Sequence, residues 1–146
     1  MSEEASSLAA GREVLEKIGL YLETRVSFAV ETTLSGKNYL RVMAEAHQKE
    51  FQVVLVYIGT ENVEINLARI ASRVLSGGHN VPEHDVRRRY TRSFQHLPQA
   101  IALSDAIVLF DNSTDQSYQL VAVGEKNFEW LEPLPQWAGA LRRHLE

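Results

Sequence analysis

Apolar residues recur every three or four positions over five stretches of the chain, and this spacing predicts amphipathic helices. The apolar stripes run through 8–22, 39–47, 63–74, 86–101 and 137–145. Gly77 and Gly78 follow the third predicted helix and are expected to end it. Pro82 opens the fourth, and Pro98 is expected to kink or divide it.

Four shorter apolar runs between these helices predict strands. They cover 26–30, 53–58, 107–110 and 120–123. The run at 53–58, VVLVYI, is continuously apolar, as expected of a strand that helices cover on both faces of a parallel sheet. Strands that alternate with helices indicate an α/β domain, here a three-layer α/β/α arrangement around a parallel sheet.

Ligands of such sheets bind at the carboxyl ends of the strands. In this chain those ends are 31–36, 59–61 and 111–113. The alternation of strands and helices therefore points to the segment VETTLSG, at 30–36, as part of a ligand site.

Composition narrows the class of protein. The 146 residues, 45% hydrophobic and 23% charged, fit a single domain over 1–146. The chain has no cysteine, which excludes disulfides, thiolate nucleophiles and cysteine metal sites. No apolar run is long enough to span a membrane and the N-terminus lacks signal-peptide features, so we expect a soluble, cytoplasmic protein that does not bind membranes.

Charge is distributed unevenly along the chain. The net charge of −4 argues against general nucleic-acid binding. Residues 69–92, however, contain six arginines and two acidic residues, a local net charge of +4. A basic window in an acidic protein indicates a local anionic target. His79 and His84 have no metal-ligand spacing, and no metal site is predicted from the residues.

Glu31, Thr32, Thr33 and Ser35 place a carboxylate and three hydroxyls after a predicted strand and before a predicted helix. A helix N-terminus accepts an anion, hydroxyls bind sugar or phosphate oxygens, and a carboxylate can hold hydrated magnesium. These four residues are candidate substrate-binding residues. The alternative is a Ser/Thr turn in which Ser35 caps the following helix.

Arg73 precedes the glycine turn, and Arg88, Arg89 and Arg92 lie on the helix that follows it. Two arginine-bearing helices joined by a flexible turn can close over a polyphosphate. One arginine on a transferring phosphoryl group contributes roughly 10³ to 10⁵ in rate, so the four are candidate catalytic residues. The alternative is a solvated helix face on which Asp85 pairs with Arg88 and Arg89.

Five strings in order resemble the zeta-toxin family of P-loop kinases, from about residue 5 to about residue 123. They are AAGREVL, SFAVETTLSGKNYL, VVLVYIG, LARIASRVLSGGHNVPEHDVRRRYTRSFQHLPQA and AIVLFDNST. The resemblance implies a P-loop kinase-like fold. It also implies phosphorylation of UDP-N-acetylglucosamine or a related sugar from ATP with Mg²⁺, and in several members neutralisation by an antitoxin protein.

The resemblance implies roles for three sets of residues. It places Glu31 and Thr32 at a strand end that faces substrate and metal. The lid-side phosphate contacts correspond to Arg73, Arg88, Arg89 and Arg92. Asp111 and Asn112 end the final core strand near the family's adenine pocket, which implies a contact with the nucleotide cofactor.

The chain departs from the family at its N-terminus. Family members begin with a strand and a glycine-rich Walker A loop, then a strand that ends in the catalytic aspartate. The 146 residues contain no GxxxxGK[ST], and that aspartate has no counterpart. The missing first strand lies between those that correspond to 26–30 and 53–58. These two are therefore expected to pair directly, unless something else, such as a homodimer, fills the gap.

Three functions remain open from the sequence. In the first, the gene product begins upstream and the intact protein is an ATP-dependent kinase of a sugar nucleotide or other small molecule. For the 146 residues as written we favour such a kinase domain by descent, expected to be inactive because the Walker A loop and the catalytic aspartate are missing. In the second, the alternative, the chain is a non-catalytic remnant of the kinase fold that binds a nucleotide or a partner. In the third, an antitoxin or scaffold reuses the fold.

Overall fold

The computed structural model describes residues 2–146, without the side chain of Glu3, as five helices and four strands. The helices are α1 (Glu3–Thr24), α2 (Asn38–Gln48), α3 (Val63–Leu75), α4 (Glu83–Ala102) and α5 (Gln136–Leu145). The strands are β1 (Val54–Gly59), β2 (Ala106–Asp111), β3 (Gln119–Gly124) and β4 (Phe128–Trp130). All five predicted helices and three of the four predicted strands are thereby confirmed within a mixed α/β fold. α4 continues through Pro98, which does not divide it.

The four strands form one sheet in the order β1-β2-β3-β4. β1 and β2 are parallel, with Tyr57 opposite Leu109, whereas β2–β3 and β3–β4 are antiparallel. The sheet is therefore mixed rather than parallel, and a parallel α/β unit occurs only where α3 and α4 connect β1 to β2. The sequence pattern did not reveal β4, which is only three residues long.

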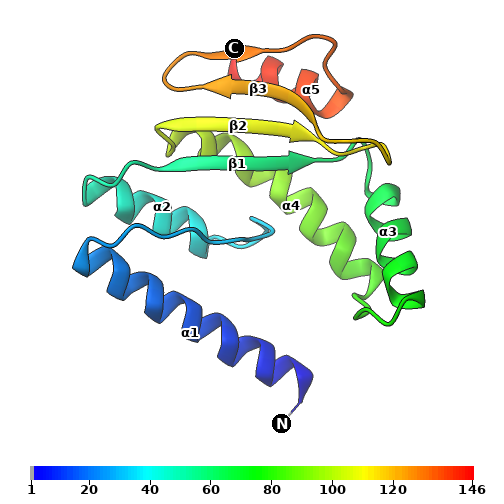
Figure 1. The fold of residues 1–146 in the computed structure, drawn as a ribbon, viewed down its shortest axis with the longest axis horizontal. Helices are drawn as coiled ribbons and strands as arrows, with labels where there is room; N and C mark the ends of the chain where they lie inside the picture. The colour runs from blue at the N-terminus through cyan, green and yellow to red at the C-terminus, as the bar shows by residue number, and fades with distance from the viewer. Residues whose placement is uncertain (1) are drawn as a thin grey trace.

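The main core lies on one face of this sheet, which α4 and α5 cover (Figure 1). Along β2, side chains that face this core are buried and the alternate ones are partly exposed. The buried members of the core come from α4, β2, β3 and α5, and include Leu97, Leu109, Val121 and Trp137. Trp130 packs against their edge, so both tryptophans belong to the core.

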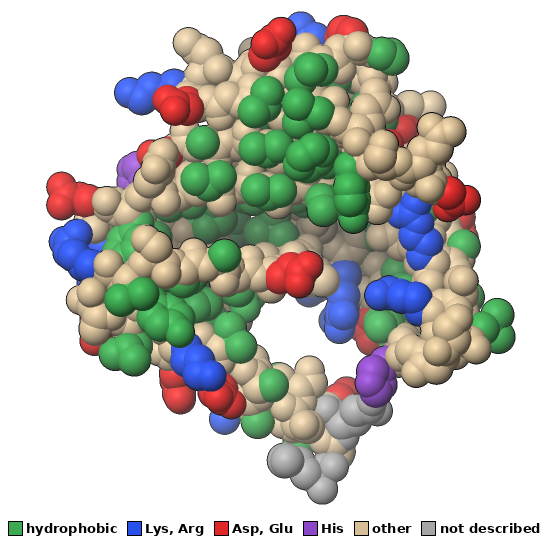
Figure 2. Space-filling view, in the orientation of Figure 1, with side chains coloured by type: hydrophobic (Ala, Val, Ile, Leu, Met, Phe, Trp, Pro, Cys, Tyr) green, Lys and Arg blue, Asp and Glu red, His purple; other side chains and the backbone are tan. Residues whose placement is uncertain are grey.

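The opposite face of the sheet is open. Val54, Val56 and Ile58 alternate with inward-facing residues along β1 and are 55%, 58% and 50% exposed. A patch of hydrophobic side chains accordingly gathers over the sheet (Figure 2). The prediction that helices cover 53–58 on both faces is wrong, because among the described residues no helix packs on this side.

Residues 26–30 do not form a strand, which contradicts the sequence-based expectation. They run as an extended segment between α1 and α2, on the far side of β1 from β2 (Figure 1). The ring of Phe28 is held between Tyr21 and Phe51, with ring centroids 5.8 and 6.3 Å away. This places Phe28 against a second, smaller core that contains Ile18, Leu22 and Ala46. The direct pairing of 26–30 with 53–58 is therefore also wrong.

The amphipathic stripe of α1 is only partly used. Ile18 and Leu22 are buried, whereas Leu8 is 68% exposed and all side chains of residues 4–14 are exposed. α1 and α4 are the longest helices of residues 2–146, and neither they nor the others are apolar enough over enough residues to cross a membrane.

Candidate functional site

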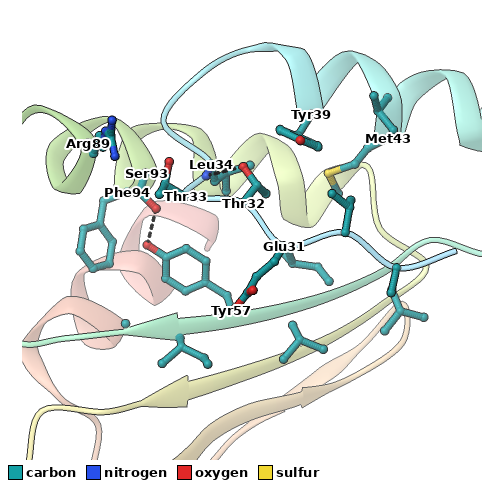
Figure 3. A pocket seen from close by; sticks show the side chains of 18 of the residues that line it. Glu31, Thr32, Thr33, Leu34, Tyr39, Met43, Tyr57, Arg89, Ser93 and Phe94 are labelled. Atoms are coloured by element: carbon teal, nitrogen blue, oxygen red, sulfur yellow. Dashed lines mark hydrogen bonds between the residues drawn. The ribbon is translucent and has the colours of Figure 1, made fainter. Parts of the chain in front are cut away.

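A cleft of about 930 Å³ separates β1 from the extended segment 28–34 and reaches onto α2, α3 and α4. We call it the β1 cleft. In Figure 2 it is the groove below the hydrophobic patch of the sheet, and it leads into a hollow bordered by basic side chains. Figure 3 shows Tyr57 rising from β1 toward Ser93 and Arg89 on α4, while Thr32 and Thr33 approach from the other side.

A tyrosine and a serine join β1 to α4 on the inner wall of the β1 cleft. Tyr57 and Ser93 share a hydrogen bond of 2.9 Å between their hydroxyl oxygens. Burial raises the pKa of Tyr57 to about 12, because a phenolate would lose its hydration there. Tyr57 therefore stays protonated at neutral pH and acts as a neutral hydrogen-bonding group.

A second tyrosine secures the carboxyl end of β1. The hydroxyl of Tyr90 donates a hydrogen bond of 2.8 Å to the carbonyl oxygen of Thr60. Burial also raises the pKa of Tyr90, against the opposing effect of that hydrogen bond. The side chain of Thr60, 8% exposed, donates in turn to Oδ1 of Asn66 at 2.6 Å. These contacts fix the position of α4 relative to the turn between β1 and α3.

The outer wall is a short turn with internal hydrogen bonds. The hydroxyl of Thr32 accepts from the backbone N–H of Leu34 at 3.1 Å, and those of Thr33 and Ser35 lie 2.8 Å apart. Leu34 has a left-handed backbone with φ of 56°, and its side chain is buried. Nδ1 of His96 on α4 lies 2.8 Å from the carbonyl oxygen of Leu34, which joins the turn to the main body.

This geometry confirms the alternative prediction for 31–36, a Ser/Thr turn. It does not confirm Ser35 as a cap, because α2 begins at Asn38 and Lys37 is its N-cap without a side-chain hydrogen bond. Glu31, Thr32 and Thr33 line the β1 cleft, whereas Ser35 does not. The turn therefore contributes one carboxylate and two hydroxyls to the site.

Only two of the four candidate arginines line the β1 cleft, namely Arg73 from α3 and Arg89 from α4. Arg88 pairs with Asp85 at 2.7 Å, as the solvated-face alternative predicted, but Arg89 does not. Arg92 lies outside the lining residues. Within residues 2–146 neither Arg73 nor Arg89 forms an ion pair, so both guanidinium groups keep their capacity for an anion.

The helical period explains this division. Val86 and Leu97 define the buried side of α4. Arg89 follows Val86 by three positions and borders that side, while Arg88 and Arg92 project away from it. The same periodicity is present in the sequence and favours Arg89. It also points to Tyr90 and Ser93, two cleft residues that are not among the predicted site residues.

Two other arginines of the basic window have structural partners. Arg87 pairs with Glu83 and Glu64 at 2.7 and 2.8 Å. Arg69 donates to the backbone carbonyl oxygens of Asn112 and Thr114, at 2.6 and 3.1 Å. Carboxylates therefore neutralise Arg87, whereas Arg69 keeps its charge but is held by backbone carbonyls. Within the β1 cleft, the positive charge available to a ligand comes from Arg73 and Arg89.

Asp111 and Asn112 lie at the end of β2, outside the β1 cleft. The carboxylate of Asp111 is 7% exposed and accepts from the hydroxyl of Ser113 at 2.7 Å and from Nε1 of Trp137 at 2.8 Å. Through its bond to Trp137, Asp111 joins α5 to the sheet. A contact of Asp111 or Asn112 with a nucleotide stays a prediction.

Two of the three predicted strand ends come together. Asn112 donates to the carbonyl oxygen of Gly59 at 2.8 Å, and the N–H of Glu61 donates to the hydroxyl of Ser113 at 2.8 Å. Segments 59–61 and 111–113 are therefore adjacent, as expected for parallel strands. Segment 31–36 is not a strand end, because residues 26–30 do not form a strand. Its residues 31–34 line the β1 cleft from the side opposite β1.

The assembled site suits an anion that also carries hydroxyls or carbonyls. Guanidinium groups bind phosphate or carboxylate oxygens through paired N–H donors. Thr32, Thr33 and Tyr57 add neutral hydroxyls, and Glu31 is the single carboxylate among the described lining residues. Apolar side chains of β1 and α2 make up much of the remaining surface.

Comparison with known proteins identifies a relative without a described activity. Over 85 residues, 58% of this chain, the sequence is 41% identical to a protein of Haemophilus influenzae described as uncharacterized. The matched part spans 61% of that protein. No protein-family profile and no solved structure matches the chain.

Proposed function

We propose that the β1 cleft binds a phosphorylated small molecule, a nucleotide or a sugar nucleotide, between Arg73 and Arg89 on one side and Thr32 and Thr33 on the other. The observation that carries this proposal is the position of two guanidinium groups, neither with an ion-pair partner among the described residues, in the same cleft as the Glu31–Thr33 turn. In an acidic protein, such a placement favours a compact anion over a long polyanion.

The same proposal places the chain in a zeta-toxin-like kinase domain. Its support is the order of the five resembling strings, together with the parallel β1–α3–α4–β2 unit and the adjacency of segments 59–61 and 111–113. A three-layer kinase-like fold is also part of the proposal, and it would require further structural elements that cover the open face of the sheet. The relationship to the zeta-toxin family also predicts a protein antitoxin, a homodimer and a cytoplasmic location, and these stay predictions.

Phosphoryl transfer is not part of the proposed activity of these 146 residues. Transfer relies on backbone N–H groups, a lysine and a magnesium-bound hydroxyl around the β-phosphate, which a Walker A loop supplies. The sequence contains no such motif. We therefore propose binding without catalysis. The alternative is an ATP-dependent kinase of a sugar nucleotide that uses further polypeptide.

A magnesium ion would fit the cleft only together with the phosphates of a ligand. Mg²⁺ binds through one or two carboxylates, phosphate oxygens and water. Glu31, the single carboxylate among the described lining residues, is the residue that would hold it. The ion would supply charge neutralisation to the phosphates, while Arg73 and Arg89 would orient them.

Calorimetric titration with ATP and with UDP-N-acetylglucosamine, with and without Mg²⁺, tests the proposal. Arg73→Gln and Arg89→Gln are each expected to weaken binding about tenfold or more, because each removes charge-assisted hydrogen bonds worth about 1.5–3 kcal/mol. Arg88→Gln and Arg92→Gln are the matched controls and should change affinity less than about threefold. Equal losses in all four variants would contradict the cleft as the site.

A kinase assay separates binding from catalysis. The 146-residue protein is expected to transfer no phosphate from ATP to UDP-N-acetylglucosamine above background. Turnover that disappears in Arg89→Gln would establish the kinase alternative and overturn the proposal of binding alone.

A further inference from the structure

β1 has one unpaired backbone edge. It pairs with β2 alone, and the carbonyl oxygens of Val53 and Gly59 accept hydrogen bonds from the β2 side. In a strand, the N–H and C=O of one residue point to the same side, and successive residues alternate. The N–H and C=O groups of Val54, Val56 and Ile58 therefore point away from β2, and within residues 2–146 no backbone group bonds to them.

This edge lies within the β1 cleft. Every residue of β1 lines the cleft, and the groove in Figure 2 follows the strand. Val42 and Met43 of α2 and the extended segment 28–34 form the wall that faces it. The free donors and acceptors of β1 are therefore accessible from a long, largely apolar groove.

The sequence of β1 lacks the features that usually keep a strand edge unpaired. Exposed edges are commonly protected by lysine, proline, bulges or very short strands. The run VVLVYI at 53–58 contains no charge, no proline and no glycine, and β1 is six residues long without a bulge. Such an edge pairs readily with another extended backbone.

We propose that the β1 cleft is also a strand-addition site, which takes one extended, apolar polypeptide segment as a fifth strand beside β1. The segment would bond to the backbone groups of Val54, Val56 and Ile58, and would bury its alternate side chains against α2 and α4. This goes beyond the binding of a small anion, since it uses the backbone edge of β1 rather than the arginines alone.

The chain's own adjacent segment does not fill this position. Phe28 is anchored between Tyr21 and Phe51, and the carbonyl of Leu34 is tied to His96. The two anchors hold segment 28–34 as the opposite wall of the cleft, with about 930 Å³ left between it and β1.

A second copy of the chain fits this space poorly. Its β1 would enter with β2 attached on one side and its own segment 28–34 facing the other. The groove is bounded by β1 on one side and by segment 28–34 on the other, which leaves no room for a strand that brings a sheet partner with it. The occupant is therefore a segment that is not already part of a sheet.

The charges in the cleft indicate that one end of the bound segment carries an acidic side chain. Arg89 lies toward the carboxyl end of β1, above Tyr57 (Figure 3), and Arg73 lines the same cleft from α3. Glu31 is the single acidic lining residue of the described chain. A strand whose apolar residues lead to an acidic side chain at that end complements both the groove and the two arginines.

A peptide with the sequence of residues 104–112, SDAIVLFDN, is a suitable probe, because it is the strand that already pairs with β1 on its other edge and it ends near an aspartate. The peptide would be acetylated, amidated and labelled for fluorescence anisotropy. Two N-methylated forms, blocked at alternate amides, serve as matched controls, since only one set of amides can face β1. We expect the two forms to differ in Kd by about tenfold or more.

Hydrogen exchange locates the peptide. In the free protein the amides of Val54, Val56 and Ile58 should exchange rapidly, and those of Leu55 and Tyr57 slowly. Bound peptide should slow the first three about tenfold or more and leave the other two unchanged. Displacement of β2 by the peptide would instead leave the first three amides fast, and would overturn the proposal.

Val56→Pro removes one free edge N–H without removing a bond to β2, and is expected to weaken peptide binding about tenfold or more. Val56→Thr keeps the N–H and the side-chain shape, and should retain most of the affinity. Replacement of the peptide's second aspartate by asparagine should weaken binding to the native protein, but not to a double variant with Arg73→Gln and Arg89→Gln.

Equal binding of the two N-methylated peptides would overturn the proposal, and so would protection of the amides of Val54, Val56 and Ile58 in the free protein. A dimer in sedimentation that Val56→Pro dissociates would also overturn it, because a second copy would then cover the edge. Loss of nucleotide binding in Arg89→Gln, with binding of the asparagine-substituted peptide retained, would leave this proposal standing by itself.

Discussion

The indole Nε1 of Trp137 donates a hydrogen bond of 2.8 Å to Oδ1 of Asp111, and both residues are 7% exposed. The bond connects α5, near the end of the chain, to the last residue of β2. Asp111 is thereby a buried carboxylate satisfied by the fold itself, with Ser113 as its second partner.

Trp137→Phe should lower the free energy of unfolding by about 2–3 kcal/mol, because a hydrogen bond to a buried charge is lost together with packing volume. Urea unfolding followed by circular dichroism measures the change. Trp130→Phe is the control, since Trp130 is only half-buried and has no side-chain hydrogen bond within residues 2–146. An equal loss in both variants would mean that the bond to Asp111 adds nothing.

Gly59→Ala tests the close approach of β1 to α5. A Cβ at this position would lie 2.7 Å from two ring carbons of Trp137, so the indole or the strand must shift. We expect a destabilisation of about 1–3 kcal/mol in thermal or urea unfolding. Gly36→Ala meets no atom within 4 Å and should stay within about 0.5 kcal/mol of the native protein. A neutral Gly59→Ala would show that Trp137 moves freely.

Tyr57 is expected to make the free energy of unfolding decrease as the pH rises above about 10. Its pKa is raised from 10.0 to about 12 by burial in the folded state, so between these values the unfolded chain binds fewer protons than the folded one. The stability contributed below pH 10 is therefore lost as pH rises, at about 1.4 kcal/mol per pH unit for this group.

Unfolding measured from pH 9 to 11.5 should show a shallower decline in Tyr57→Phe than in the native protein. Tyr118→Phe, which alters a tyrosine that is 57% exposed, should leave the slope unchanged. Tyr90, whose pKa is also raised by burial, accounts for part of the slope that remains in Tyr57→Phe. Identical slopes in all three proteins would contradict the buried phenol.

His96→Leu should loosen the outer wall of the β1 cleft, because the carbonyl of Leu34 loses its 2.8 Å partner. We expect about 1 kcal/mol less stability and a weaker affinity for ATP or UDP-N-acetylglucosamine. His144→Leu, at an exposed position of α5, is the control for a change of histidine to leucine. Unchanged affinity with lowered stability would show that the turn at 31–35 does not contribute to ligand binding.

The sequence predicted local structure well where one feature was sufficient. Apolar spacing located all five helices, and β-branched runs located β1, β2 and β3. It was less informative for the site. Arg73, Arg88, Arg89 and Arg92 are chemically alike, and only the rotation of each helix about its axis decides which guanidinium faces the β1 cleft. That rotation follows from packing at Val86 and Leu97.

Segment 26–30 shows why β propensity alone is insufficient. A strand requires another strand as the hydrogen-bonding partner of its backbone, and this segment has none among residues 2–146. Phe28 instead anchors the segment in the second core, and an open cleft separates it from β1. The run at 53–58 has the composition of a strand buried on both faces, yet one face stays open because no other element of residues 2–146 reaches it.

The sequence by itself determined the five helices, the strands β1, β2 and β3, and the availability of a carboxylate, hydroxyls and arginines, because spacing and residue chemistry are local properties. Only the tertiary structure decided that Glu31, Thr32 and Thr33 line one cleft together with Arg73 and Arg89, and that within residues 2–146 β1 keeps an unpaired edge there. Both depend on contacts between residues far apart in the chain, which no local pattern encodes.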